Sequence, residues 1–472
     1  MSYPQKHTIQ RLVVEVEVYT EQSDNLREEA WLRIVSDWLY STFLPLLEEM
    51  LDKMALSNER ICLAQLTLDL GEINQTEWKE LSGFSEGHIR QTIEIALKSV
   101  QEVPAYKRPS EGQNTMEAFL FFLKTGRLPW WYTPRPISEW ESQIMDALAE
   151  SPPKSGLLFK DTAVSLRLAG HFSQSLFQKL IQKYFGQYYE RSAEIQERIK
   201  RLVTALHLSQ SRRQEMEAAV RTTLLQAFGQ NLPVEQLPMY VLNHLPEKAF
   251  SVLRKATLAL AAGAGKREED KQWIELIAAG KEQIMNKSWV VGQEIRGAEE
   301  RLSETQTTDE IYITNAGLVL LHPFITYFFE ELNISKNGKI LKPQRAVMLL
   351  QWLASGQSDP AEYDLPLNKL LCGLSPEAPV VGKWKLTKRE KNEARQLLEA
   401  VIRHWHVLRN TSTAGLQGNF LCREGKLTRK SEGDWLLQIE RKSMDILLAD
   451  LPWGISMIQL PWMPHWLWVE WA

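Results

Sequence analysis

The residue whose surroundings point most directly to chemistry is Ser85, at the centre of the G-x-S-x-G motif GFSEG (83–87). This motif places a serine nucleophile at a sharp turn between a buried strand and a helix. The preceding residues 78–82, WKELS, do not read as a buried apolar strand. We therefore expect Ser85 to be the N-cap of the helix that follows, where its hydroxyl accepts a backbone N–H, and not a nucleophile.

Two histidines, His404 and His406, could suggest a metal site. Residues two apart on a helix point about 200° from one another, so the two imidazoles could not bind one ion. Neither an H-E-x-x-H motif nor a carboxylate at ligand spacing accompanies them. The three cysteines are far apart and form no C-x-x-C pair, which argues against a zinc site or a disulfide framework; they are Cys62, Cys372 and Cys422.

Phosphate-binding chemistry is not indicated either. The pair Gly265 and Lys266 is followed by Arg267, where a phosphate-binding loop needs Ser or Thr, and no strand precedes it. The net charge of −4 gives no general attraction to nucleic acid. The sequence thus predicts no catalytic residue, no metal, no cofactor, no small-molecule substrate and no nucleic-acid partner.

Length and composition set the organisation. A chain of 472 residues with 44% hydrophobic and 24% charged residues can build several cores, and about three domains are expected. No apolar block of signal length opens the sequence, and prolines and polar residues interrupt every membrane-length window near the C-terminus. We expect a cytoplasmic protein that does not insert into membranes.

The first 103 residues read as a small α+β domain. Residues 9–19 alternate between apolar and polar side chains and predict a strand, and residues 64–70 predict a second one. Between them, Asp24 can cap a helix that Pro45 kinks or restarts. Residues 89–100 supply a further helix. Strand, helix and strand together predict a crossover unit.

Residues 114–300 are expected to form a helical middle region, built of helical hairpins. Asn114 with Glu117, and Ser138 with Glu141, have capping-box spacing. Gly126 and Pro129 are expected to end the first of these helices.

The C-terminal domain, residues 311–472, is expected to mix helices with strands that end in a tryptophan-rich stretch. Helices are predicted over residues 344–354 and 391–407, and strands over 455–460 and 466–471. Six of the 17 tryptophans follow residue 434, and a run this dense must be packed or covered by a partner. We favour burial of the last strand on both faces over an exposed docking surface. The fold class is therefore α+β, predominantly helical.

Several long motifs, in this order, resemble the tape measure proteins of bacterial contractile injection systems. They are FLKTGRLPWW (122–131), NAGLVLLHPF (315–324), LNKLLCG (367–373), HW (404–405) with NTS (410–412), FLCREG (420–425) and DILLADLPWG (445–454). A second Leu-Pro-Trp unit follows at residues 460–462. The positions that carry the resemblance are Gly126, Pro129, Trp130, Trp131, Gly317, His322, Pro323, Asn368, Lys369, Asn410, Pro452, Trp453, Gly454, Pro461 and Trp462.

The resemblance implies a structural protein that lies in the lumen of the inner tube and limits tube polymerisation. Its implied partners are the tube, the spike and baseplate, and a tube terminator. As one helix, the chain would reach about 700 Å at ~1.5 Å per residue, and the helical middle alone ~250 Å. Prolines and strand patterns break such a helix, so either the chain opens inside the tube or it supplies the end modules of a longer ruler. The alternative function is a soluble assembly factor or adaptor for tube, spike or cargo.

Overall fold

The structure is a computed structural model. It describes residues 9, 12–15, 28–54, 63, 65–71, 85–101, 109–133, 135–150, 161–204, 206–261, 271, 273–275, 277, 310–382, 385–430 and 433–471. These residues fall into two compact units. The first comprises residues 1–117, 130–133 and 146–151, and the second comprises residues 118–129, 134–145 and 152–472.

The first unit is built around helices α1 (Glu28–Trp38), α2 (Leu44–Met54) and α4 (Glu86–Gln101). A π-helical turn, Leu39–Phe43, separates α1 from α2 just before Pro45, as the proline predicted. Ile89 and Ile93 of α4 are fully buried against Leu47 of α2. The carboxylate of Glu49 also pairs with Arg90 across these two helices at 2.6 Å.

The predicted N-terminal strands lie only partly within the described residues. Residues 12–15 belong to no strand, and the side chains of Leu12, Val13 and Val14 are about half exposed. Residues 65–71 also belong to no strand, yet their exposure alternates as predicted: Leu66 and Leu68 pack on the core of α2 and α4. Asp24 lies outside the described residues.

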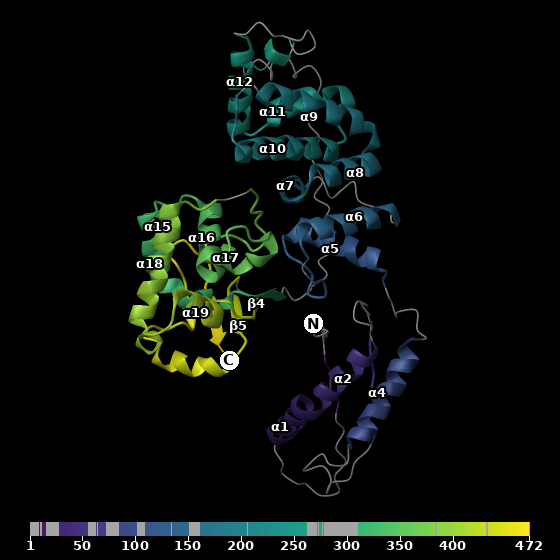
Figure 1. The fold of residues 1–472 in the computed structure, drawn as a ribbon. Coiled ribbons are helices and arrows are strands. Elements are labelled where there is room, and N and C mark those ends of the chain that lie inside the picture. The colour runs from purple at the N-terminus through teal and green to yellow at the C-terminus, as the bar shows by residue number, and fades with distance from the viewer. Residues whose placement is uncertain are drawn as a thin grey trace, which may run out of the picture. The chain divides into compact units, whose positions relative to one another are not determined.

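The described part of the helical region contains the helices α5 (Glu111–Thr125), α6 (Ile137–Glu150), α7 (Thr162–His171), α8 (Gln174–Tyr184), α9 (Tyr189–Thr204), α10 (Gln210–Gly229), α11 (Leu237–His244) and α12 (Glu247–Ala261). Figure 1 shows α7 to α12 as a stack of short helices. The predicted capping boxes at Asn114 and Ser138 are wrong, because both residues lie inside helices. Ser110 and Gln113 make the reciprocal capping bonds of α5 instead.

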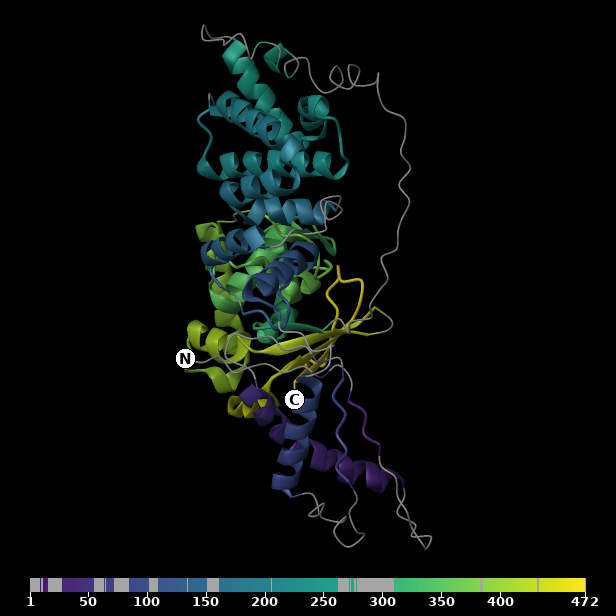
Figure 2. The same ribbon diagram turned by 90° about the vertical axis from the view of Figure 1, so that its right-hand side faces the viewer.

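The C-terminal lobe is organised around a five-stranded sheet, whose strands appear as arrows in Figures 1 and 2. Its strand order is β1-β4-β5-β7-β6. Its strands are β1 (Glu310–Ile313), β4 (Gly425–Arg429), β5 (Trp435–Ile439), β6 (Met457–Ile458) and β7 (Leu467–Trp471). All neighbouring strands are antiparallel except β5 and β7, which are parallel. A two-stranded hairpin, β2 (Ser335–Lys336) with β3 (Lys339–Ile340), stands apart from this sheet.

Helices α15 (His322–Glu331), α16 (Pro343–Ser355), α17 (Pro366–Leu371) and α18 (Lys388–His404) share the core of this lobe with the sheet. The predicted helix at 344–354 is thus confirmed, and the one at 391–407 is confirmed as far as His404, where α18 ends. Shorter elements complete the lobe: the 3-10 helices η5 (Ala316–Leu321), η6 (Glu362–Asp364), η7 (His406–Leu408) and η9 (Ser443–Asp450), the helix α19 (Thr413–Leu416) and the π-helix η8 (Gln417–Leu421).

One face of the sheet is buried and the other is not. Ile311, Leu427, Leu437 and Val469 lie opposite one another across four strands and are all buried. On the other face of the sheet, Trp468 of β7 is 39% exposed. The predicted strand at 466–471 is therefore present as β7, but the prediction that both of its faces are buried is wrong.

The fold class, predominantly helical α+β, is confirmed. In the described part of the chain, no helix is long and apolar enough to cross a membrane.

Candidate functional site

The short helix α17 is where most of the buried polar contacts of the second unit meet. All six of its residues are buried. Pro366 occupies its first turn, where a missing N–H costs no helical hydrogen bond. Six residues cannot stabilise a helix by themselves, so α17 depends on the contacts of its side chains.

Asn368 ties α17 to the core of the C-terminal lobe. Its amide nitrogen donates to Gln351 Oε1 at 3.0 Å and to the Val347 carbonyl at 3.3 Å, both on α16. Its amide oxygen accepts from Asn315 Nδ2 at 2.8 Å, which also donates to Gln351 at 2.9 Å. Because these three side chains are buried, each unmade bond would cost about 1–3 kcal/mol. The network therefore fixes α17 against α16 and against Asn315, two residues after β1.

Lys369 ties the same helix to a buried carboxylate. Its ammonium donates to Glu362 Oε1 at 2.9 Å and to the Pro376 carbonyl at 3.1 Å. Neither the lysine nor the glutamate side chain has any exposed surface. Burial lowers the pKa of Lys369, and the neighbouring Glu362 carboxylate acts in the opposite direction.

Arg167 brings the helical region to this carboxylate. It lies on α7, and its Nε donates to Glu362 Oε1 at 3.1 Å. Its Nη1 donates to the carbonyls of Leu123 and Lys124, each at 2.9 Å, at the C-terminal end of α5. A cation there complements the negative end of the helix. Its Nη2 donates to the Glu377 carbonyl.

Two further charged or titratable side chains lie here: His171, which contacts Glu362, and Arg127, which contacts Glu377. His171 Nε2 lies 2.9 Å from Glu362 Oε2 and donates to it in the tautomer that carries the proton on Nε2. Arg127 pairs with the Glu377 carboxylate at 3.2 Å. Burial by itself raises the pKa of Glu362, but the hydrogen bond from His171 and the charges of Lys369 and Arg167 outweigh it and lower this pKa to about 2.

Gly126 is the residue that lets α5 approach the cluster. It follows Thr125, the last residue of α5, with φ of +71°, as predicted for the end of that helix. A Cβ atom at this position would lie 2.5 Å from Glu362 Oε1 and 2.8 Å from Arg167 Nη2. Only glycine fits both the backbone conformation and the space.

This cluster holds separate segments of the chain together. Both oxygens of Glu362 are within hydrogen-bond distance of buried or half-buried donors. The donors come from α7 and α17, whose partners extend to α5. We call the set of Arg167, His171, Glu362 and Lys369 the ion cluster. Among the described residues, no group of three His, Cys, Asp or Glu side chains could hold a metal ion.

The motifs that meet at α17 are those of a known family. The sequence model for contractile injection system tape measure proteins matches residues 6–471. The chain belongs to this family. No curated protein matches the chain, and no solved structure does.

The other predicted positions of this tape measure protein divide into packed and exposed ones. Trp462 donates from Nε1 to the Leu371 carbonyl at 2.8 Å, so the second Leu-Pro-Trp unit also packs on α17. Trp453 donates to the Leu320 carbonyl at 3.1 Å. Gly317 lies so close to the Phe420 carbonyl that no side chain fits there.

His322 and Pro323 begin α15. Burial lowers the pKa of His322, although its Nδ1 lies 3.1 Å from the Val319 carbonyl. Pro129 is buried and Trp131 is half-buried. The remaining positions are exposed: Trp130, Asn410, Pro452, Gly454 and Pro461.

Sequence reasoning missed Arg167, His171 and Glu362 as partners of Lys369. Arg167 and Glu362 are 195 residues apart, and neither lies in a motif that resembles the family. A single sequence carries no signal for such a pairing. Ser85 is the N-cap of α4, as predicted: its Oγ accepts from the His88 N–H at 3.3 Å.

Proposed function

We propose that this tape measure protein, a structural and assembly component of a contractile injection system by its family, works inside the inner tube and limits how far the tube polymerises. The match of the family over residues 6–471 is the observation that supports this most. In this proposal the chain has no catalytic residue, binds no cofactor or nucleic acid, and does not insert into a membrane.

The proposed partners follow from that place in the particle. One end of the chain would be held by the spike and baseplate, tube rings would stack around it, and a terminator would cap the tube. The chain would be made and assembled in the cytoplasm and then stay in the tube lumen.

The geometry adds a condition to this proposal. Residues 161–261 fold into a stack of short helices, and the ion cluster joins α7 to α17. A chain folded in this way reaches less far than an open one, because a continuous helix rises ~1.5 Å per residue. To measure a tube, the stack must open.

The same observation favours a second function, a folded assembly factor that binds tube, spike or cargo components and leaves before the particle is finished. The ion cluster would then keep its folded surface intact. The two functions differ in whether the chain remains in the particle.

The test is the copy number of the chain in purified particles, measured by mass spectrometry with isotope-labelled standards. A tape measure remains at a few copies per particle and resists added protease until the tube is disrupted. A sheath subunit on the outside serves as the control and should be cleaved at once. If finished particles lack the chain, the lumen proposal is wrong and the assembly factor is correct.

A further inference from the structure

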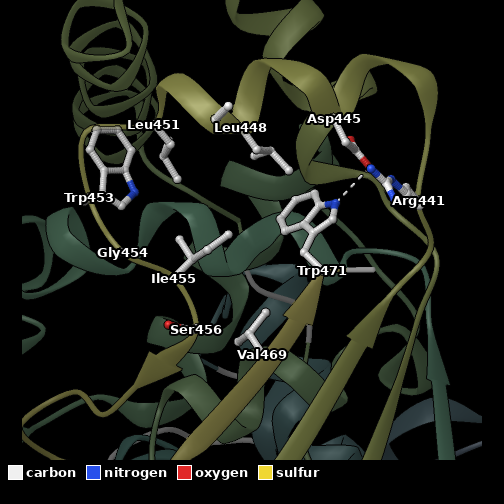
Figure 3. A pocket seen from close by; sticks show the side chains of 11 residues that line it. Arg441, Asp445, Leu448, Leu451, Trp453, Gly454, Ile455, Ser456, Val469 and Trp471 are labelled. Atoms are coloured by element: carbon white, nitrogen blue, oxygen red, sulfur yellow. Dashed lines mark hydrogen bonds between the residues drawn. The ribbon is translucent and has the colours of Figure 1, made fainter.

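A groove of about 540 Å³ lies beside the last strand of the sheet. Figure 3 shows it between the chain segment of Trp453 to Ser456 on one side and Val469 and Trp471 of β7 on the other, with η9 above. Its size falls within the range of pockets that take a ligand. It lies where β6 would run if that strand continued alongside β7.

The backbone edge of β7 is open at this groove. β6 has two residues and pairs only with Leu467 and Trp468. One more bond follows, from the Val469 N–H to the Ser456 carbonyl at 2.9 Å. Successive residues of a strand direct their N–H and C=O groups to alternate sides. The backbone groups of Trp466 point toward β5, since its carbonyl accepts from the Trp435 N–H.

It follows that Trp471 directs its N–H away from β5 and into the groove. No backbone bond joins that N–H to another residue in the described part of the chain. An open strand edge is a template for pairing with another extended segment.

The side chains of the groove select the kind of segment. Polar and apolar groups share its walls about equally, and Leu448, Ile455 and Trp471 supply apolar surface. Asp445 adds no free negative charge, because it pairs with Arg423 and accepts from Trp471 Nε1 at 3.0 Å. Arg441 lines the rim, is exposed, and has no ion-pair partner among the described residues. An extended segment with apolar side chains and a carboxylate fits this combination.

The chain itself carries a segment of that chemistry. Residues 12–18 read LVVEVEV, a composition that favours a strand. In the described part, residues 12–15, no strand is formed and Val13 is 59% exposed. Glu15 is exposed as well, and no described residue forms an ion pair with it. Exposed β-forming residues without a sheet are an edge-pairing hazard unless a partner covers them.

We propose that residues 12–15 of one copy add as a strand to the β7 edge in the groove of a second copy, with Glu15 opposite Arg441. Each copy offers one segment and one groove, so the contact is head-to-tail and joins copies in a row. The inference goes beyond the proposed function and does not depend on where in the particle the chain works.

The first test uses a fluorescent peptide of residues 8–19 and the full chain, with binding followed by anisotropy. Saturable binding is expected. Arg441→Glu should weaken it about tenfold, because like charges then face each other. A peptide carrying Glu15→Arg should recover about that factor on the Arg441→Glu chain. Arg409→Glu, another exposed arginine, is the matched control and should bind as the wild type does.

Backbone pairing is tested separately with two N-methylated peptides. One is methylated at Leu12 and Val14, and the other at Val13 and Glu15. In a strand only one of these sets of N–H groups faces β7, so one peptide should bind and the other should not. Equal behaviour of the two peptides would overturn the edge pairing.

The involvement of a second copy is tested by sedimentation velocity. The wild-type chain should form larger species as its concentration rises, while the Glu15→Arg and Arg441→Glu chains should each remain single. Mixed in equal amounts, these two variants should form larger species again, since the segment of each variant then has a charge opposite to that of the other variant's groove. The proposal is overturned if the peptide does not bind, or if the wild type stays single at every concentration.

Discussion

Replacement of Glu362 by glutamine should loosen the contact between α7 and α17 more than any other change of equal size. The amide keeps the shape of the side chain but leaves Arg167 and Lys369, both without exposed surface, with no negative partner. Removing one partner of a buried ion pair costs about 3–5 kcal/mol. The pKa gives a similar magnitude: its change from 4.5 to about 2 corresponds to about 3 kcal/mol at ~1.4 kcal/mol per unit.

Hydrogen–deuterium exchange is the suitable assay, because a chain with several folded units has no single unfolding free energy. Amides of α7 and α17 should exchange about 100-fold faster in Glu362→Gln at pH 7. A second change, Lys369→Met, should recover part of the loss in the double variant, since one of the two unpaired cations is removed.

The control is Glu331→Gln. Glu331 lies 3.8 Å from Arg389 at the surface, with about half of its side chain exposed, and such pairs contribute about 0–1 kcal/mol. If Glu362→Gln changes exchange no more than Glu331→Gln does, the ion cluster does not stabilise the second unit.

The pH dependence follows from the same pKa. The pKa of Glu362 is lower in the folded chain than its ordinary value, so its contribution is fully present above pH 4.5. The contribution is lost as the pH falls toward about 2. Accelerated exchange of α7 and α17 in the wild type should therefore set in below pH 4.5, and Glu362→Gln should not show this step.

Three further changes test other parts of the structure, each by hydrogen–deuterium exchange of the amides around the changed residue. Gly126→Ala should cost more than Gly71→Ala, because both have positive φ but only Gly126 lacks space for a Cβ; the Gly71 change alone should cost about 1 kcal/mol. Asp364→Asn should stabilise by about 3 kcal/mol at pH 7 and have little effect near pH 4, because burial raises the pKa of Asp364 from 3.8 to about 6 and the buried charge costs stability above it. Trp405→Ala should cost about 3–5 kcal/mol since Trp405 is fully buried, whereas Trp468→Ala, 39% exposed, should cost much less. These assignments would be contradicted if the two glycine variants lost equal stability, or if the two tryptophan variants did. They would also be contradicted if Asp364→Asn still stabilised the chain at pH 4.

Local patterns in the sequence were sufficient to predict much of the fold. The spacing of apolar residues located α16, and the alternation along β7 put Leu467 and Val469 on the same face of the strand. Periodicity could not tell that the other face of β7 is uncovered, because tryptophans at alternate positions look the same whether a second layer packs on them or not. The exposure of Trp468 depends on which elements are present elsewhere in the fold.

The candidate site was harder to predict. Lys369 and Gly126 were singled out by resemblance to the family, but their meeting point, Glu362, lies in no such motif. A pairing across 195 residues leaves no trace in composition or spacing.

The predicted capping boxes were wrong because residue spacing alone does not fix where a helix begins. Asn114 and Ser138 have the required partners three residues later, yet α5 begins earlier, at Glu111. The division into domains at residues 103, 114, 300 and 311 stays a prediction.

Tube length after duplication of residues 174–261 is the measurement that tests the central claim most directly. This range contains α8 to α12 and leaves Arg167 and His171 in place. Electron microscopy of negatively stained particles should show tubes lengthened by a fixed amount, about 130 Å if the added residues are helical at ~1.5 Å each. Deletion of the same range should shorten them by a similar amount. Tubes of unchanged length in smaller numbers would contradict the account and show an assembly factor that does not measure.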